Sequence, residues 1–242
     1  MTQLEKGHIV RRFDGELSHL HAMIMEMGAL VLDQLSRAVA ALRDEDAAAA
    51  RCVIERDRGV DEANQRIDEE IIDILAKRQP VAIDLREVIT IAKSVTDLER
   101  IGDLARKVAR LVVKIYDTDG QTVPNPKMLQ DIPYLAGLSS EMLRDSLDAF
   151  DCMDMRQALA VIERDQGMEG ELEGALRRLA TYLLQDARSV GCAIDTVLVL
   201  RAVERMGGHA KNIAESVIYL GTGTDVRFLD FDSLKAEVLA RL

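Results

Sequence analysis

The chain has 242 residues, enough for one large domain or two small ones, each able to bury a core. It is 48% hydrophobic and only 3% aromatic, with 4 Pro and no Trp, which excludes collagen-like and low-complexity chains and favours helical bundles over all-β folds. The 31 Lys and Arg against 42 Asp and Glu give a net charge of −11, which repels nucleic acid and anionic lipid headgroups. We therefore expect a helical protein that does not bind nucleic acid.

The N-terminal segment and the cysteines predict a cytoplasmic location. The first 16 residues carry charges where a signal peptide needs an apolar core, and no stretch reaches the roughly 18 apolar residues of a membrane span. Cys52, Cys152 and Cys192 are odd in number and far apart, which fits a reducing compartment. We expect a soluble protein that reaches a membrane only through partners.

The chain contains one pattern twice. The sequence VIERD at Val53–Asp57 recurs 108 residues later at Val161–Asp165. The sequence LERIGDLA at Leu98–Ala105 is matched 105 residues later by VERMGGHA at Val203–Ala210. Two matches in the same order indicate an internal duplication with a small change in loop length.

Breaker residues divide each copy into three helices. Pro80 stops the second helix, and the Asp, Gly and Pro residues of 117–126 separate the copies. Short loops between long helices imply antiparallel neighbours, so the predicted fold class is all-α, with two tandem, duplicated three-helix bundles. The expected helices span roughly 8–43, 46–77, 82–117, 131–150, 154–186 and 191–220, and the expected domains are 1–120, 121–220 and a C-terminal tail at 221–242 with an amphipathic segment at 234–242.

Acidic residues of the first copy occupy helix positions where apolar residues are expected. Asp57 interrupts an apolar stripe of the second helix, and Asp61 follows it on the same face. Glu99 interrupts a stripe of the third helix and is followed by Asp103. Four converging carboxylates repel each other, which a cation or protonation relieves. Oxygen ligands on facing helices suit hard or borderline cations and can bridge several metals, so a metal site is one interpretation.

The second copy carries a weaker version of this acidic pattern. Asp165 and Glu169 repeat the first pair, and Glu204 repeats the glutamate of the second pair. Gly208, however, stands where the last aspartate would lie. A helix-interior glycine also follows the glutamate in both copies, at Gly102 and Gly207. Such a glycine costs about 1 kcal/mol relative to Ala, so we expect a neighbouring backbone or a ligand to approach closely there.

Ion pairing is the alternative interpretation of these acids. Arg56 and Arg164 precede the two aspartates, and Arg100 and Arg205 follow the two glutamates. Structural ion pairs also create acidic clusters of this kind. Spacing alone leaves both interpretations open.

Three segments resemble signatures of the PhoU family, whose members are bacterial phosphate-transport accessory proteins. They are RQPVAIDLR at 78–86, DLERIGD at 97–103 and ERMGGHAKNIAE at 204–215. The resemblance extends over roughly 10–220 and includes the duplication. It implies two tandem three-helix bundles.

The resemblance also implies a cytoplasmic, non-catalytic regulator. Members of that family restrain phosphate uptake and keep the phosphate-starvation two-component system silent when phosphate is plentiful. They do so by contacting the ATPase subunit of the phosphate transporter and the sensor histidine kinase. The same resemblance implies metal motifs of the form E(D)-x-x-x-D, two per bundle, which hold multinuclear iron or zinc clusters. On this chain the motifs map to Asp57 with Asp61, Glu99 with Asp103, Asp165 with Glu169, and Glu204 with Gly208.

Because Gly208 lacks a carboxylate, we expect iron, zinc or another divalent metal chiefly in the first bundle. We also expect a homodimer. The predicted partner-binding residues are Arg78, Asp84, Arg86, Arg100 and Arg205. For Asp84 there is an alternative interpretation, as an N-cap or first-turn acid that interacts favourably with the dipole of the third helix.

Two other functions are alternatives to a regulator. One is a ferritin-like di-metal carboxylate protein, although the Glu-x-x-His pairs of that class are missing from the acidic clusters. The other is a helical scaffold without a ligand. The sequence contains neither a phosphate-binding loop nor an HExxH motif, so we do not expect an enzyme.

Overall fold

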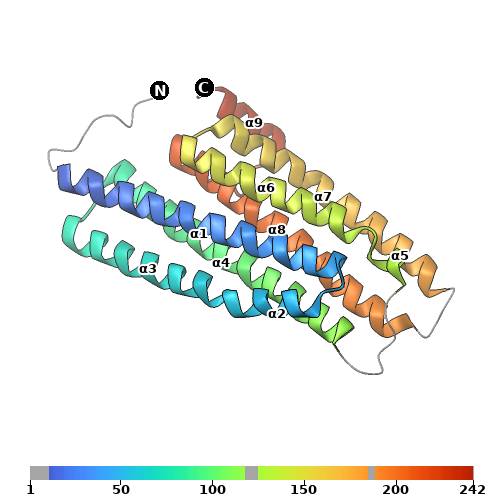
Figure 1. The fold of residues 1–242 in the computed structure, drawn as a ribbon. Helices are drawn as coiled ribbons and strands as arrows, with labels where there is room; N and C mark the ends of the chain where they lie inside the picture. The colour runs from blue at the N-terminus through green and yellow to red at the C-terminus, as the bar shows by residue number, and fades with distance from the viewer. Residues whose placement is uncertain (1–10, 118–124, 185–188, 242) are drawn as a thin grey trace.

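The computed structural model describes residues 11–117, 125–184 and 189–241, and these residues form helices and connections without strands (Figure 1). This confirms the all-α fold class. The predicted helix residues 8–10 and 185–186, and most of the predicted boundary between the copies, lie outside the described residues. The helices are α1 (Arg11–Arg43), α2 (Ala47–Arg56), α3 (Arg58–Arg78), α4 (Ala82–Tyr116), α5 (Pro126–Leu129), α6 (Ile132–Cys152), α7 (Met155–Leu183), α8 (Val190–Thr222) and α9 (Phe231–Leu239).

The duplication extends to the turns that join the helices. Glu45 and Met153, which are 108 residues apart, both have positive φ angles, of 57° and 53°. Each is followed by an aspartate whose carboxylate caps the next helix: Asp46 accepts from the Ala49 N–H, and Asp154 from two N–H groups of the first turn of α7. The same turn therefore starts the second helix of both copies.

The second helix of the first copy differs from the prediction. A single helix was expected over 46–77, but the structure interrupts it at Asp57, between α2 and α3. At this residue the Val60 N–H donates to the Asp57 carbonyl oxygen at 2.9 Å, an i to i+3 bond that tightens the turn. The corresponding α7 runs without interruption. The interruption lies at the acid that the sequence singled out.

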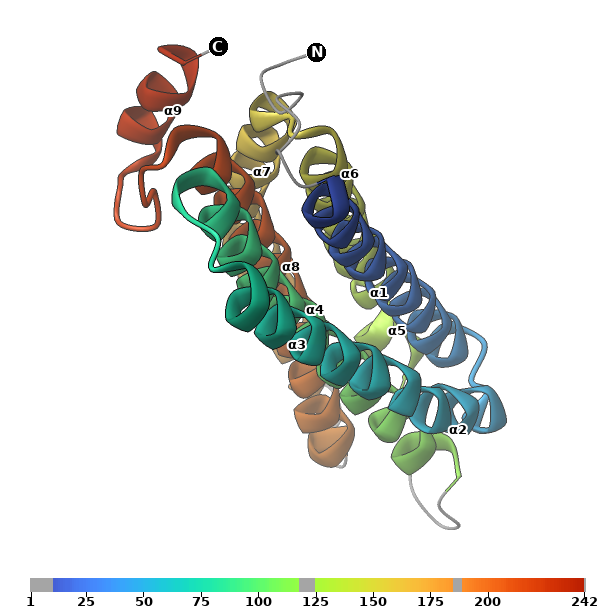
Figure 2. The same ribbon diagram turned by 90° about the vertical axis from the view of Figure 1, so that its left-hand side faces the viewer.

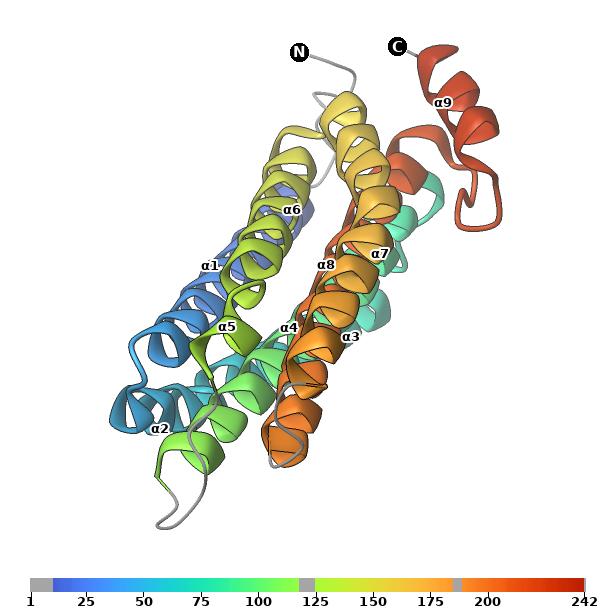
Figure 3. The ribbon, with the colours of Figure 1, turned by 90° about the vertical axis from the view of Figure 1, so that its right-hand side faces the viewer.

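The two bundles meet through α4 and α8, which run antiparallel. Asp97 of α4 accepts a hydrogen bond from Asn212 of α8, while Lys114 near the end of α4 pairs with Asp195 near the start of α8. A second contact joins α1 to α6, which lie side by side in Figures 1 and 3. The main cluster of buried apolar residues spans both bundles. The copies therefore share one core.

The pattern of buried residues explains the central place of α4 and α8. Helix α4 is buried on two sides, with Leu98 and Ile101 in one apolar stripe and Val88 and Val95 in another. Figure 2 shows α4 lying between α3 and α8. Helix α9 rests against α7 through Leu234 and Val238. None of the helices within the described ranges has the length and apolar character needed to cross a membrane.

Candidate functional site

The first cluster consists of Asp57, Asp61, Glu99, Asp103 and Arg106. The side chain of Asp57 is almost fully buried, with the residue only 2% exposed. Arg106 of α4 donates one terminal nitrogen to Asp57 and the other to Asp103, so its guanidinium bridges α4 and the α2–α3 junction. A buried carboxylate without a counter-ion is costly. Arg106 supplies this counter-ion, so Asp57 can remain charged inside the bundle.

Gln34 of α1 completes the surroundings of Asp57. Its Nε2 donates to Asp57 Oδ1 at 2.7 Å. Its Oε1 is buried and has no hydrogen-bond partner among the described residues. The buried aspartate thus connects α1, α3 and α4.

The outer acids of the first cluster are less well compensated. Burial is the main cause that raises the pKa of Glu99, and the neighbouring Asp103 raises it further. Burial likewise raises the pKa of Asp61, with Asp57 adding to the effect and Arg106 opposing it. The acids therefore interact electrostatically, Asp61 with Asp57 and Asp103, and Glu99 with Asp103 and Asp61.

The arginines that precede the aspartates in sequence do not neutralise them. Arg56 pairs with Asp33 at 3.4 Å and Arg164 with Asp145 at 2.8 Å. Arg100 lies 3.5 Å from Glu99 and is more than half exposed. The ion-pair interpretation thus holds for Asp57, but through Arg106, which the sequence motifs do not include.

Gly102 allows Gln34 and Asp57 to approach α4. A Cβ atom on this glycine would lie 3.2 Å from Val60 Cγ1 and 3.4 Å from Gln34 Oε1. At the matching Gly207, a Cβ would meet the side chain of Met168 at 3.1 Å. Close approach is confirmed in both copies, and the neighbouring groups are side chains rather than backbone.

The second cluster, formed by Asp165, Glu169, Glu204 and Lys211, is more open. Lys211 Nζ lies 3.1 Å from Asp165 Oδ2. Glu169 is exposed, and a Cβ on Gly208 would meet nothing within 4 Å. Lys211 follows Arg106 by 105 residues, the offset of the third helices. Both copies therefore place a basic side chain beside the aspartate of the second helix.

The residues of the first cluster fit a metal only in part. Four carboxylates and the unpartnered Gln34 Oε1 are oxygen donors that a divalent cation accepts. The guanidinium of Arg106, however, lies between Asp57 and Asp103. Within the described residues, no three His, Cys, Asp or Glu side chains are arranged to hold a metal ion. A metal would have to displace Arg106, and the predicted iron or zinc site stays a prediction.

The predicted partner-binding residues fall into two groups. Arg78 donates two hydrogen bonds of 2.7 Å to Glu16, and Arg86 donates to the Leu220 carbonyl oxygen at 3.3 Å and lies over the Tyr219 ring. Both arginines therefore also hold the fold together. Asp84 lies in the first turn of α4, whose N-cap residue is Val81, so the first-turn role is the one the structure shows. Arg100 and Arg205 are exposed and line one pocket between α4 and α8.

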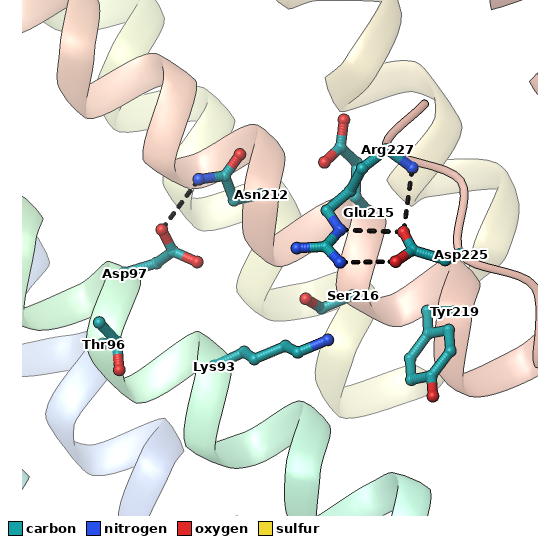
Figure 4. A pocket seen from close by; sticks show the side chains of 9 residues that line it. All are labelled: Lys93, Thr96, Asp97, Asn212, Glu215, Ser216, Tyr219, Asp225 and Arg227. Carbon is teal, nitrogen blue, oxygen red and sulfur yellow. Dashed lines mark hydrogen bonds and ion pairs between the residues drawn. The ribbon is translucent and has the colours of Figure 1, made fainter. Parts of the chain in front are cut away.

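A second pocket, of about 410 Å³, lies between α4 and α8 and is closed on one side by the segment after α8 (Figure 4). Two of its acids, Asp97 and Asp225, have neighbouring partners. Asp97 accepts from Asn212 and contacts His209, and Arg227 lowers the pKa of Asp225 to about 2 by hydrogen bonding. Burial raises the pKa of Glu215. The lining residues are Lys93, Thr96, Asp97, Asn212, Glu215, Ser216, Tyr219, Asp225 and Arg227.

Known proteins similar to this chain match both copies. The model of the PhoU domain matches residues 24–112 and 132–217. The phosphate-specific transport system accessory protein PhoU homolog of Pseudomonas aeruginosa is 41% identical over 231 residues, which cover 96% of this chain and 94% of that protein. The phosphate-specific transport system accessory protein PhoU of Escherichia coli K12 is 36% identical over 227 residues, covering 94% and 92%.

Two solved structures share the fold. The crystal structure of PhoU from Pseudomonas aeruginosa has a TM-score of 0.82 and 41% identity, covering 88% of this chain and 100% of that one. The phosphate transport system regulatory protein PhoU from Streptococcus pneumoniae has a TM-score of 0.79 and 28% identity, covering 89% and 100%. Sequence and fold agree over both bundles, and the chain therefore belongs to the PhoU family.

Proposed function

We propose that this protein is a non-catalytic negative regulator of phosphate uptake and of phosphate-starvation signalling. It acts in the cytoplasm by binding the ATPase subunit of the phosphate transporter and the sensor histidine kinase. The observation that carries the proposal is the match to phosphate-specific transport system accessory proteins over nearly the whole chain. Both bundles are included in that match, so the regulator uses the complete fold.

The pocket between α4 and α8 that Arg100 and Arg205 line supports this role. Arg100 of α4 and Arg205 of α8 are equivalent residues of the two copies, and both are exposed at one pocket. An exposed arginine pair in a chain of net charge −11 gives a partner a local basic surface. We place the contact with an acidic region of a partner protein there, while Arg78 and Arg86 support the ends of the helices.

A complementation experiment tests the regulatory role. The chain is expressed in a bacterium whose own PhoU has been deleted, and a phosphate-starvation reporter is measured in high phosphate. We expect the chain to restore repression. Mild crosslinking and purification should then recover the transporter ATPase or the sensor kinase. Failure of both repression and recovery, with the protein present and folded, contradicts the proposal.

Charge reversal locates the contact. Arg100→Glu and Arg205→Glu should each reduce partner recovery. The matched control is Arg144→Glu, because Arg144 is exposed on α6 and has no described partner. Equal recovery of the partner protein by all three variants would show that the contact does not lie at this pocket.

The ferritin-like alternative is not favoured. It requires metal ligands that converge, whereas Arg106 bridges Asp57 and Asp103 in the first cluster. In the second cluster Lys211 pairs with Asp165. Oxygen consumption after addition of ferrous ion would be the observation that restores this alternative.

A further inference from the structure

The pocket that contains Arg100 and Arg205 is strongly basic. It has a volume of about 420 Å³ and lies between α4 and α8. Four arginines, one lysine and one histidine line it, against one acid, Asp103. We call it the basic pocket. Such a concentration of positive charge contrasts with the net charge of −11 of the whole chain.

The cations of the basic pocket differ in how far they are compensated. Arg106 is fully engaged with Asp57 and Asp103. Arg100 approaches Asp103 only at 3.7 Å. His209 is held by Asp97 through Nδ1 at 2.8 Å.

Three cations of the basic pocket have no acid within ion-pair distance in the described part of the chain. They are Lys107 and Arg110 of α4 and Arg205 of α8, and all three are exposed. Lys107 and Arg110 lie three residues apart and so share a helix face, and Arg205 reaches the same pocket from the other bundle. Unlike the pocket of Figure 4, this one keeps an excess of positive charge.

The lining also limits the chemistry of a ligand. Leu104 is the apolar residue that lines the basic pocket, and no Phe, Tyr or Trp does. A nucleobase or a drug-like apolar molecule therefore lacks a surface to stack on. Arginine forks and a lysine ammonium are the groups that proteins use for phosphate oxygens.

Charge and size favour more than one phosphate group. A single phosphate group carries a charge of about −1.5 to −2 near pH 7, which leaves part of three cations uncompensated. The pocket, of about 420 Å³, is open to solvent and leaves room for more than one tetrahedral anion. A chain of linked phosphates matches both the charge and the room.

We propose that the basic pocket between α4 and α8 binds a phosphate-type oxyanion with linked phosphate groups, through Lys107, Arg110 and Arg205. Because the ligand bridges residues of both bundles, its binding couples α4 to α8. The inference does not depend on the proposed regulatory function, since purified protein without any partner is sufficient for the test.

Isothermal titration calorimetry of the full chain at fixed ionic strength tests the proposal. The probes are orthophosphate, pyrophosphate and tripolyphosphate, and we expect affinity to rise in that order. Arg110→Gln and Arg205→Gln should each weaken tripolyphosphate binding about tenfold, as expected for one lost charged contact. Arg144→Gln, outside the pocket, should leave it unchanged.

Three results would overturn the assignment. They are absence of binding by all three phosphates, equal binding by wild type and both pocket variants, and equally tight binding of a hexaglutamate peptide. The last result would identify the pocket as a general acidic-segment site. Phosphate binding without partner recovery in cells would contradict the regulatory proposal alone, so the two failures are distinguishable.

Discussion

Replacing Arg106 tests which group neutralises the buried Asp57. In Arg106→Met, the aspartate keeps the hydrogen bond from Gln34 but loses its counter-ion. Removing one partner of a buried ion pair costs about 3–5 kcal/mol. The Arg106 side chain is 25% exposed, so water partly replaces it, and we expect a smaller cost than this range, about 2–3 kcal/mol. For a chain of this size, that loss lowers Tm by about 4–12 °C.

A double-mutant cycle separates this pair from other effects of the substitution. Asp57→Asn removes the charge but keeps an oxygen for Gln34, so Arg106→Met in that background should cost less than about 1 kcal/mol. Arg110→Met is the matched control, because Arg110 lies one turn further on α4, is exposed and has no described partner. It should change stability by no more than about 0.5 kcal/mol. Urea unfolding followed by circular dichroism gives all these values.

The same variants test the metal prediction. If Arg106 is the resident cation, a chelator and added zinc or ferrous ion leave the Tm of the wild type unchanged. The role of Arg106 as the resident cation would be refuted by two results together: a chelator lowers the Tm of the wild type, and Arg106→Met leaves that Tm unchanged. A metal rather than the guanidinium would then neutralise the cluster. An equal cost of Arg106→Met with and without the Asp57 charge would show that the guanidinium does not neutralise Asp57.

Three further substitutions test the surroundings of the two clusters. Because burial and Asp103 raise the pKa of Glu99 in the folded state, its ionisation costs stability as pH rises past the unfolded value of about 4.3. Glu99→Gln should therefore be more stable than wild type at pH 7 and show no gain below about pH 4, and an equal gain at both pH values would contradict this. Gly102→Ala places a Cβ 3.2 Å from buried Val60 and should destabilise by about 1 kcal/mol, which Val60→Ala should relieve; a neutral result would show that the neighbours give way. Gly208→Ala meets nothing within 4 Å and should stabilise by about 0.5–1 kcal/mol in the same urea assay, so a loss would contradict the open space there.

Periodicity and the repeat were sufficient to predict the fold. The offset of 108 residues relates not only VIERD to its copy but also the turn residues Glu45 and Met153 and the caps that follow them. Local signals of this kind depend on neighbouring residues, which a sequence displays directly. The break at Asp57 escaped prediction because its backbone angles are helical, with φ −55° and ψ −31°. Gly59 follows two residues later, but the matching Gly167 lies inside the uninterrupted α7, so this glycine does not signal a break.

The partners of the acids could be predicted less well, because they come from distant helices. Gln34 and Arg106 are 23 residues before and 49 residues after Asp57. On sequence alone Arg106 was one of 31 basic residues. One signal could have found it: Lys211 in the second copy occupies the position that matches Arg106. Comparing the copies for basic as well as acidic residues would have identified both cations.

The differences between the copies explain why their clusters differ in openness. Gln34 of the first copy corresponds to Met142 of the second, and a Cβ on Gly207 would lie 3.5 Å from the sulfur of that methionine. Because Met142 of α6 replaces the glutamine, Asp165 receives no amide hydrogen bond from this position. The side chain of Asp165 is 21% exposed. Water then solvates Asp165, and a flexible lysine at 3.1 Å is sufficient where the first copy uses a bridging guanidinium. Asp165→Asn should therefore cost much less stability than the loss of the Asp57 charge partner, and an equal cost would show that burial does not set the difference.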